Sequence, residues 1–433
     1  MARKMKDSGI EWIGEIPTDF SLYKLKYLLS SPLCYGANES GTLYSDILPR
    51  YIRITDISPN GTLKNSGMLS LDESSAQNYM LHEGDILFAR SGATVGKSFI
   101  YHNYYGRAAY AGYLIKASFN RLVLPEFVYY YTCSSAYEIW KNSIFIQSTI
   151  QNIGADRYSN LPISVPNSID KQLRIVRYLN NFCSKFDAII YNLQTSIEDY
   201  KKLKQAVITQ AVTKGVRGER EMKDSGVEWI GEIPEEWNKC KLKNISIDIG
   251  DGLHGTPKFD DSGEVYFING NNFSSEYVAP KFDTKKLCLE ESLNYPKPEL
   301  TEQTIMISLN GSYGKVCLYR YFPMLLGKSA GYITLLPSIN RRYVRYYLSS
   351  TPAQTIMTLS LNGTTIPNLS LNTLYNFPTI LPSASEQAEI ADYLDAKCAE
   401  IDGLIAKKEQ LVKELESYKK SLIYEVVTGK REV

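Results

Sequence analysis

The sequence is poor in the residues and runs that mark several common classes of protein. It has only three histidines in 433 residues, and its seven scattered cysteines form no CxxC pair. The chain therefore offers no His/Cys cluster typical of a metal site, and HEG at 82–84 is not the HExxH of zinc proteases. No apolar run approaches the roughly 18 residues of a membrane-spanning helix. An odd, dispersed set of cysteines predicts free thiols and a cytoplasmic location.

Motifs for catalysis and nucleotide binding are also missing. The sequence has no G-x-S-x-G, no G-x-G-x-x-G that opens a helix, no carboxylate pair at nuclease spacing and no Asn-Pro-Pro-aromatic tetrapeptide. RSGATVGKS at 90–98 is similar to a phosphate-binding P-loop, but position 91, where that loop needs glycine, is serine. We therefore expect no catalytic residues, and a glycine-rich loop between two strands with Lys97 and its counterpart Lys315 at the tip.

The chain has almost no net charge, since 48 Lys and Arg residues face 47 Asp and Glu residues. Residues 18–170 alone carry 12 basic and 12 acidic side chains. Neutralisation of phosphates dominates non-specific binding to nucleic acids. Any nucleic-acid binding would therefore depend on local basic patches and on partner proteins that add further contacts.

What the sequence does contain is a duplication. MKDSGIEWIGEIP at 5–17 recurs at 222–234 with a single Ile→Val change, and residues 172–215 align without gaps to 387–430. Shorter matches lie between these blocks: TIQNI (149–153) with TIPNL (365–369), and GDILFARSGATVGK (84–97) with QTIMISLNGSYGK (303–315). The chain is one module written twice.

Two long segments have helical periodicity. Apolar residues recur every three or four positions from Leu179 to Val207 and again from Leu394 to Val426, with no proline in either stretch. Helices of about 40 residues would each span roughly 60 Å. One apolar seam on each helix predicts an antiparallel coiled coil, although separate packing of each helix on its own domain stays open. The segments between them contain short β-branched and aromatic runs broken by Gly, Pro, Asn and Asp, which is typical of sheet-rich domains.

The predicted fold is therefore α+β with a pseudo-twofold internal repeat, in which a long antiparallel two-helix coiled coil separates two sheet-rich α+β domains. The first domain, with its N-terminal strip, covers residues 1–170, and the first spacer helix covers 171–216. A linker, the second strip and the second domain cover 217–385, and the second spacer helix covers 386–433.

The repeated 13-residue strip follows the end of the first helix at its second occurrence. We therefore expect its first copy to dock in the same way beside the end of the second helix. Trp12 and Trp229 are the predicted anchors of the two copies, and Pro17 and Pro234 end them.

Together these features resemble the specificity subunit of a type I restriction-modification system. The resemblance covers essentially the whole chain. It rests on the duplicated DSGxEWIGEIP, on two variable domains that each close with P-x-x-x-P and a glutamine (162–172 and 378–387), and on two similar helices that end in a Val-Thr-Lys/Gly phrase.

The resemblance implies that each globular domain is a target-recognition domain that reads one half of a bipartite, asymmetric DNA site with an unread spacer. The helices would set the spacer and dock two modification subunits, which bind S-adenosylmethionine and methylate adenine. Restriction subunits that use ATP and Mg²⁺ would join the same complex. This chain would bind no cofactor, carry out no catalysis and contact no membrane.

Sequence readout in the major groove uses forked, amide and hydroxyl side chains on loops. We therefore select residues of these types in the loops that the two repeats share as candidate DNA contacts. For each candidate, the alternative that it only forms a turn or carries a surface charge stays open. In the first domain the candidates are Arg53, Arg90, Ser91, Thr94, Lys97, Gln147, Ser148 and Gln151. In the second domain they are His254, Asn269, Asn271, Asn310, Ser312, Tyr313, Lys315, Asn362, Thr364 and Thr365. Asn152 and Asn368 occur in both repeats and are expected to form turns.

An alternative function is a protein-interaction scaffold whose two domains bind polypeptides and not DNA. An electrophoretic shift with random duplex, measured with and without a methyltransferase partner, discriminates between the two functions.

Overall fold

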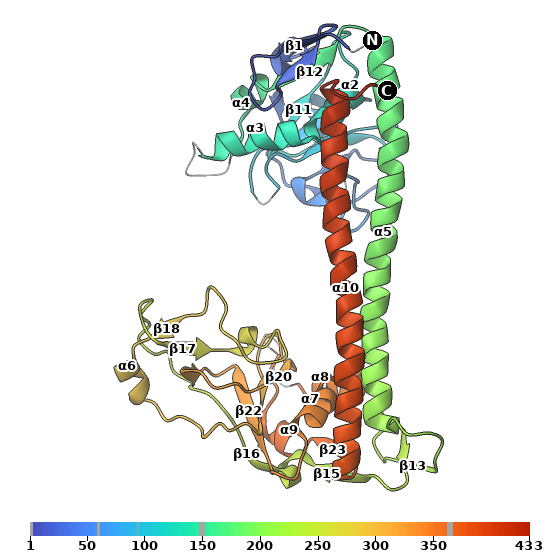
Figure 1. Ribbon diagram of the computed structural model, residues 1–433. Coiled ribbons are helices and arrows are strands. Elements are labelled where there is room, and N and C mark those ends of the chain that lie inside the picture. Colours follow the sequence, from blue (N-terminus) through green and yellow to red (C-terminus); the bar gives the residue numbers. More distant parts are fainter. Residues whose placement is uncertain (1–2, 59–60, 93, 147–151, 362–366) are drawn as a thin grey trace. The chain divides into compact units, whose positions relative to one another are not determined.

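The computed structural model describes residues 3–58, 61–92, 94–146, 152–361 and 367–433 of the chain. Its internal contacts divide the chain into two units of similar size (Figure 1). Unit 1 consists of Met1–Gln194 and Gln410–Val433, and unit 2 consists of Thr195–Glu409. Each unit combines a globular part with segments of both long helices.

The helices differ greatly in length. The globular part of unit 1 contains α1 (Glu73–Ala76), α2 (Pro125–Thr132), α3 (Ser135–Ile146) and α4 (Ala155–Ser159). The globular part of unit 2 contains α6 (Leu289–Leu293), α7 (Arg341–Ser349), α8 (Thr351–Leu359) and α9 (Leu371–Tyr375). The two long helices are α5 (Ile169–Lys214) and α10 (Ala384–Val427), each beginning two residues before the predicted start.

Unit 1 is rich in short strands. They are β1 (Met5–Asp7), β2 (Glu15–Pro17), β3 (Phe20–Lys24), β4 (Cys34–Tyr35), β5 (Thr42–Leu43), β6 (Arg50–Ile52), β7 (Leu69–Ser70), β8 (Ile86–Ala89), β9 (Ser98–Ile100), β10 (Ala108–Tyr110), β11 (Leu114–Ala117) and β12 (Pro162–Pro166). The two larger sheets have the orders β4-β11-β8-β9 and β10-β6-β7-β5. β12 pairs with β3, and β1 pairs with β2.

Unit 2 repeats this topology. Its strands are β13 (Met222–Asp224), β14 (Glu232–Pro234), β15 (Asn238–Lys241), β16 (Ser246–Asp251), β17 (Val265–Ile268), β18 (Lys286–Leu287), β19 (Thr304–Ser308), β20 (Val316–Leu318), β21 (Met324–Leu326), β22 (Ala330–Leu335) and β23 (Pro378–Leu381). The order β16-β22-β19-β20 matches β4-β11-β8-β9, and the three-stranded order β21-β17-β18 matches β10-β6-β7, with no strand equivalent to β5 among the described residues. Each unit includes a parallel pair of strands, β6 with β10 and β17 with β21. The duplication predicted from the sequence is therefore confirmed in the fold.

The long helices run antiparallel to each other within each unit. In unit 1, Lys419 Nζ lies 2.6 Å from Asp187 Oδ1, and residues further along α10 pack with residues earlier in α5. The repeat-equivalent pair in unit 2, Lys204 Nζ and Asp402 Oδ2, is also 2.6 Å apart. Such exposed ion pairs contribute under about 1 kcal/mol each to the free energy of unfolding. They show how α5 and α10 are aligned, and the stability of the helix pair comes from its apolar seam. The alternative in which each helix packs only on its own domain is wrong.

The N-terminal strip docks on the end of α10 within unit 1. Ile13 and Ile16 are buried in one cluster with Ile423 and Val427. The Tyr424 hydroxyl donates to the Ile13 carbonyl at 3.1 Å. Arg3 Nη1 donates to the carbonyl of Gly429 at 2.9 Å, and this bond satisfies a carbonyl just beyond the end of the helix. The predicted docking strip is therefore confirmed in unit 1.

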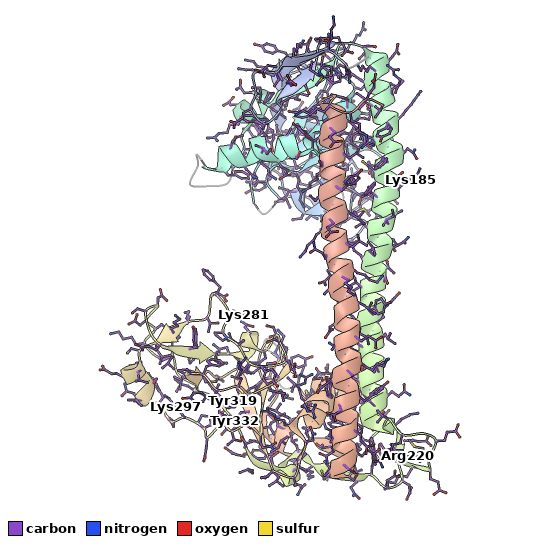
Figure 2. The ribbon with its side chains drawn as sticks, in the orientation of Figure 1. Lys185, Arg220, Lys281, Lys297, Tyr319 and Tyr332 are labelled. Atoms are coloured by element: carbon purple, nitrogen blue, oxygen red, sulfur yellow. The ribbon has the colours of Figure 1, made fainter. Side chains whose placement is uncertain are left out.

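The second strip docks on the end of α5 within unit 2 by the same means. Ile230 and Ile233 are buried with Ile208 and Val212 of α5. Figure 2 shows Arg220 beside this helix end, where its Nη2 donates to the Lys214 carbonyl at 3.0 Å. In each copy, one buried isoleucine comes from the turn between the two short strands and one from the second strand.

The two tryptophans differ in burial. Trp12 packs against the cluster that contains Ile13 and Ile16, in agreement with its predicted role, whereas Trp229 keeps 47% of its surface exposed, which argues against that role for the second copy.

Replacement of Gly429 by alanine should loosen the first strip. Gly429 has φ +74°, and a Cβ there would lie 2.6 Å from Pro17 Cγ. The left-handed backbone costs alanine about 1–2 kcal/mol, and overpacking adds about 1–3 kcal/mol. Denaturant unfolding of Gly429→Ala should therefore show a clearly lower midpoint.

Gly9→Ala is the matched control, because Gly9 has φ +72° and a Cβ added there would meet no atom within 4 Å. It should lose only the backbone contribution of about 1–2 kcal/mol. Equal losses in the two variants would show that Gly429 does not hold the strip.

A circular permutant should fold, because the strip and the C-terminal end of α10 belong to the same unit. We expect a chain that joins residue 433 to residue 1 and opens at Gly218 to be soluble with unchanged helical circular dichroism. Gly218 is exposed, and a Cβ added there would meet no atom within 4 Å. A chain opened inside α5, at residue 190, is the control that should fail. Insolubility of the Gly218 permutant beside a soluble parent would contradict the docking scheme.

Candidate nucleic-acid interface

In each unit a glycine-rich loop joins two antiparallel strands of the larger sheet. The loop between β8 and β9 is closed by a bond from Gly96 N to the Ala89 carbonyl at 2.9 Å. The loop between β19 and β20 is closed by Gly314 N and the Ser308 carbonyl at the same distance. Because a strand and not a helix follows each loop, the prediction of a strand-loop-strand element is confirmed, and 90–98 is not a P-loop.

A second chain segment crosses each loop at its first residue. Ile153 N donates to the Arg90 carbonyl at 2.8 Å, and Leu369 N donates to the Leu309 carbonyl at 2.8 Å. The neighbouring residues form backbone bridges, Ser91 with Asn152 and Asn310 with Asn368. The two asparagines shared by the repeats therefore take part in these bridges and help to fix the loops.

Four of the candidates in the first domain lie in this loop, namely Arg90, Ser91, Thr94 and Lys97. The guanidinium carbon of Arg90 lies 4.9 Å from the centre of the Tyr35 ring. Lys97 is exposed, and its side chain forms no ion pair with any described residue. This loop therefore presents two cationic groups that are available to a ligand.

Arg53 is not available in the same way. Its guanidinium forms a fork with Asp56, with Nε to Oδ2 at 3.1 Å and Nη2 to Oδ1 at 2.8 Å, and it also donates to the Gly67 carbonyl. The hydrogen bond to Asp56 raises the pKa of Arg53. Since Asp56 is buried, release of Arg53 would leave a buried carboxylate without its partner. Arg53 therefore holds this turn together, and its donors are less available than those of Arg90; its role in base reading stays a prediction.

The second loop carries Asn310, Ser312, Tyr313 and Lys315. Lys315 and Ser312 are exposed, and the Tyr313 hydroxyl donates to Thr358 Oγ1 of α8 at 3.3 Å. Asn310 Nδ2 donates to the Lys328 carbonyl at a long 3.4 Å. These four candidates are therefore together on one surface of unit 2.

The other described candidates of unit 2 have different surroundings. Asn269 Oδ1 accepts from Ser329 Oγ at 3.1 Å, so its side chain holds neighbouring loops together. Asn271 is exposed in the short turn that follows β17. His254 Nε2 lies 2.7 Å from Asp251 Oδ2. Gln147, Ser148, Gln151, Asn362, Thr364 and Thr365 lie outside the described residues.

A hollow of about 690 Å³ adjoins the second loop within unit 2. Its lining combines the apolar Phe273, Val316 and Leu359 with Lys315, two glutamines and six residues that carry hydroxyl groups, Ser274, Ser275, Ser349, Thr351, Thr355 and Thr358. Hydroxyl and ammonium donors of this kind suit phosphate oxygens. The sequence did not reveal this set because it comes from segments far apart in the chain.

Two further residues of unit 1 were missed by reasoning from the sequence. Tyr35 at the end of β4 contacts Arg90, and the carbonyl of the 63%-exposed Tyr113 accepts from Arg90 N at 3.1 Å. Their position depends on the pairing of β4 with β11. No local pattern indicates that pairing, and among 33 tyrosines nothing distinguished these two.

The described residues contain no group of three or more His, Cys, Asp or Glu side chains that could hold a metal ion. All seven cysteines are free thiols. Within the part of the chain that the structure describes, no helix is both long and apolar enough to cross a membrane.

Comparisons with known proteins agree with this geometry. The chain is 26% identical over 361 residues to the type I restriction enzyme MjaVIII specificity subunit of Methanocaldococcus jannaschii, covering 81% of this chain and 80% of that protein. It is also 26% identical over 433 residues to the putative type I restriction enzyme MjaX specificity subunit of the same organism, covering 96% and 95%. A solved structure from a study of complex assembly in the type I R-M system superimposes with a TM-score of 0.72 at 16% identity, over 96% of this chain and 99% of that one, and shares the fold.

The family model of the type I restriction modification DNA specificity domain matches residues 44–199 and again residues 234–414, once in each repeat. These two ranges cover most of the chain, so the family predicted from the duplicated strip and helices is confirmed. The chain belongs to the type I restriction modification DNA specificity family.

Proposed function

We propose that this chain is the DNA-reading subunit of a type I restriction-modification complex, in which each unit reads one half of a bipartite, asymmetric target with an unread spacer. The proposal rests on the loop that follows β8 in unit 1 and on the equivalent loop that follows β19 in unit 2. The same main-chain bonds hold it in both units, while its side chains differ except at two shared glycines and at Lys97 and Lys315. A fixed frame with exchangeable side chains is what sequence readout requires.

The differences between the two loops favour an asymmetric target. Unit 1 places Arg90 and Ser91 where unit 2 places Leu309 and Asn310. An arginine fork and a leucine cannot select the same base, because one donates two hydrogen bonds and the other donates none. Two identical half-sites are therefore not expected.

The partners in this proposal are two modification subunits, restriction subunits and double-stranded DNA. S-adenosylmethionine, ATP and Mg²⁺ would bind to those subunits, and this chain would carry out no reaction. Its near-zero net charge supports a need for partners, because a neutral protein gains little from phosphate neutralisation. Isolated chain should therefore bind duplex DNA more weakly than the complex does.

Methylated adenines, mapped across the genome of the host with and without this gene, test the proposal directly. We expect one motif to disappear with the gene, with two specified segments of different sequence and a gap of constant length. Return of the gene in trans should restore the motif. An unchanged methylation map in a strain that expresses the modification subunits would contradict the function. So would a palindromic motif.

Lys97 and Lys315 should contribute through charge alone. Loss of one phosphate contact lowers the slope of log K against log salt by about 0.9. We expect Lys97→Ala and Lys315→Ala each to reduce that slope by about this amount and to weaken all duplexes alike. Lys97→Arg is the matched control that keeps the charge. A change in the preferred sequence with an unchanged salt slope would show that the lysine reads a base.

A further inference from the structure

We infer that Arg90, held on the ring of Tyr35, specifies a guanine in the half-site read by unit 1, and that unit 2 specifies no guanine from the equivalent position. This inference rests on the proposed function and names the base that one residue recognises. Four features support it: the stacking of Arg90, its unpaired donors, the chemistry of the fork and the contrast with unit 2.

The guanidinium of Arg90 is already oriented before any ligand binds. Its carbon lies 4.9 Å from the centre of the Tyr35 ring, a cation–π contact. The Tyr35 hydroxyl accepts from Ala155 N at 3.0 Å, so the ring itself is fixed to the start of α4. The main chain of Arg90 is bonded on both sides, to Tyr113 and to Ile153. A side chain held in this way loses less entropy when it binds.

Two polar atoms at this place have no partner among the described residues. Arg90 Nε and Asn152 Oδ1 are both buried there without a hydrogen bond. The Nη atoms of Arg90 likewise form no hydrogen bond or ion pair within the described parts of the chain. A charged donor left unpaired costs free energy that a ligand acceptor would recover. Arg53 differs in this respect, because its donors are taken up by Asp56 and Gly67.

The fork selects guanine by its chemistry. Guanine presents two acceptors, O6 and N7, on the edge that faces the major groove, and an arginine can donate to both at once. Adenine presents one acceptor and one donor there, so one of the two arginine donors would meet another donor. Correct pairing is worth about 1–3 kcal/mol of discrimination, which corresponds to about 5- to 150-fold.

Unit 2 has the same backbone without this chemistry. The bond from Leu309 N to the Ser329 carbonyl at 3.0 Å repeats the bond from Arg90 N to Tyr113. The strand registers place Asp251 where unit 1 has Tyr35. Leu309 is 3% exposed. The ring, the fork and the second tyrosine of unit 1 are thus replaced by Asp251, Leu309 and Ser329.

The test is selection of bound duplexes from a randomised library by the complete complex that contains this chain. Wild-type complex should enrich a two-part motif. With Arg90→Gln, one guanine in one part should fall from strongly preferred to unselected, by about 5- to 150-fold, while the other part stays unchanged. Arg90→Lys should lose most of that preference as well, because a lysine keeps the charge without the fork.

Tyr35 is a positioning residue. Its variants show whether the ring orients the Arg90 guanidinium or only stabilises the fold of unit 1. Tyr35→Leu should weaken the same guanine preference with no change in the second half-site, whereas Tyr35→Phe, which keeps the ring, should retain most of it. Thermal unfolding of each variant must match the wild type, and Lys97→Ala serves as the control that weakens all sequences alike.

The outcomes are distinct. If wild-type complex enriches no motif, the proposed function fails. If it enriches a motif that Arg90→Gln leaves unchanged, or that weakens equally in both parts, the guanine assignment is wrong and the proposed function stands. Loss of a base other than guanine also overturns the assignment.

Discussion

Main-chain hydrogen bonds hold the loop after β8 and the loop after β19, and every proposed contact depends on this constraint. In both units the first loop residue accepts from a crossing segment at 2.8 Å, and the last glycine donates back to the end of the strand at 2.9 Å. Because no side chain of the loop is needed for these bonds, the side chains can change without loss of the frame. A specificity subunit needs this separation, since its fold must persist while its target changes.

The same separation explains what the two repeats share and what they do not. The strips, the ends of the helices and the strand orders agree between the units, because they carry the packing. The loops that could face a ligand differ, and so do the residues that brace them. The carbonyl of Gly96 accepts from the Tyr137 hydroxyl at 2.6 Å, whereas the carbonyl of Gly314 accepts from Gln354 Nε2 at 2.8 Å. The equivalent carbonyl thus accepts from a tyrosine hydroxyl of α3 in unit 1 and from a glutamine amide of α8 in unit 2.

The sequence predicted the duplication, the antiparallel helices, the docking strip and the strand-loop-strand element, because each leaves a local pattern. It failed where the outcome depends on contacts between distant segments. Arg53 and Arg90 were both selected as loop arginines, yet only the structure shows that Asp56 takes up the donors of Arg53. Tyr35 became a candidate only through the pairing of β4 with β11. The different burial of Trp12 and Trp229, which stand at the same place in two nearly identical strips, likewise depends on surroundings that the strip itself does not specify.

Two nearly identical strips in one chain raise the question of how each finds its own helix ends. The repeat position just after the start of each long helix carries opposite charges, Lys171 in unit 1 and Glu386 in unit 2. Lys171 pairs with Asp19 in unit 1. The buried Glu386 accepts from Trp237 Nε1 at 3.0 Å and pairs with Arg220 at 2.6 Å.

An exchange of residues 3–20 with residues 220–237, which include the strips and their flanks, would break the second arrangement. Phe20 stands at the repeat position of Trp237 and has no N–H to offer Glu386, so a buried carboxylate would lose a donor. Arg3 holds the repeat position of Arg220 and already shares Asp19 with Lys171, so the arginine suits either place. Apolar contacts that are shared by both copies supply the docking energy, and the unshared hydrogen bond from Trp237 to Glu386 favours the second segment at its own place. The repeat can therefore keep its common packing and still fold in one way.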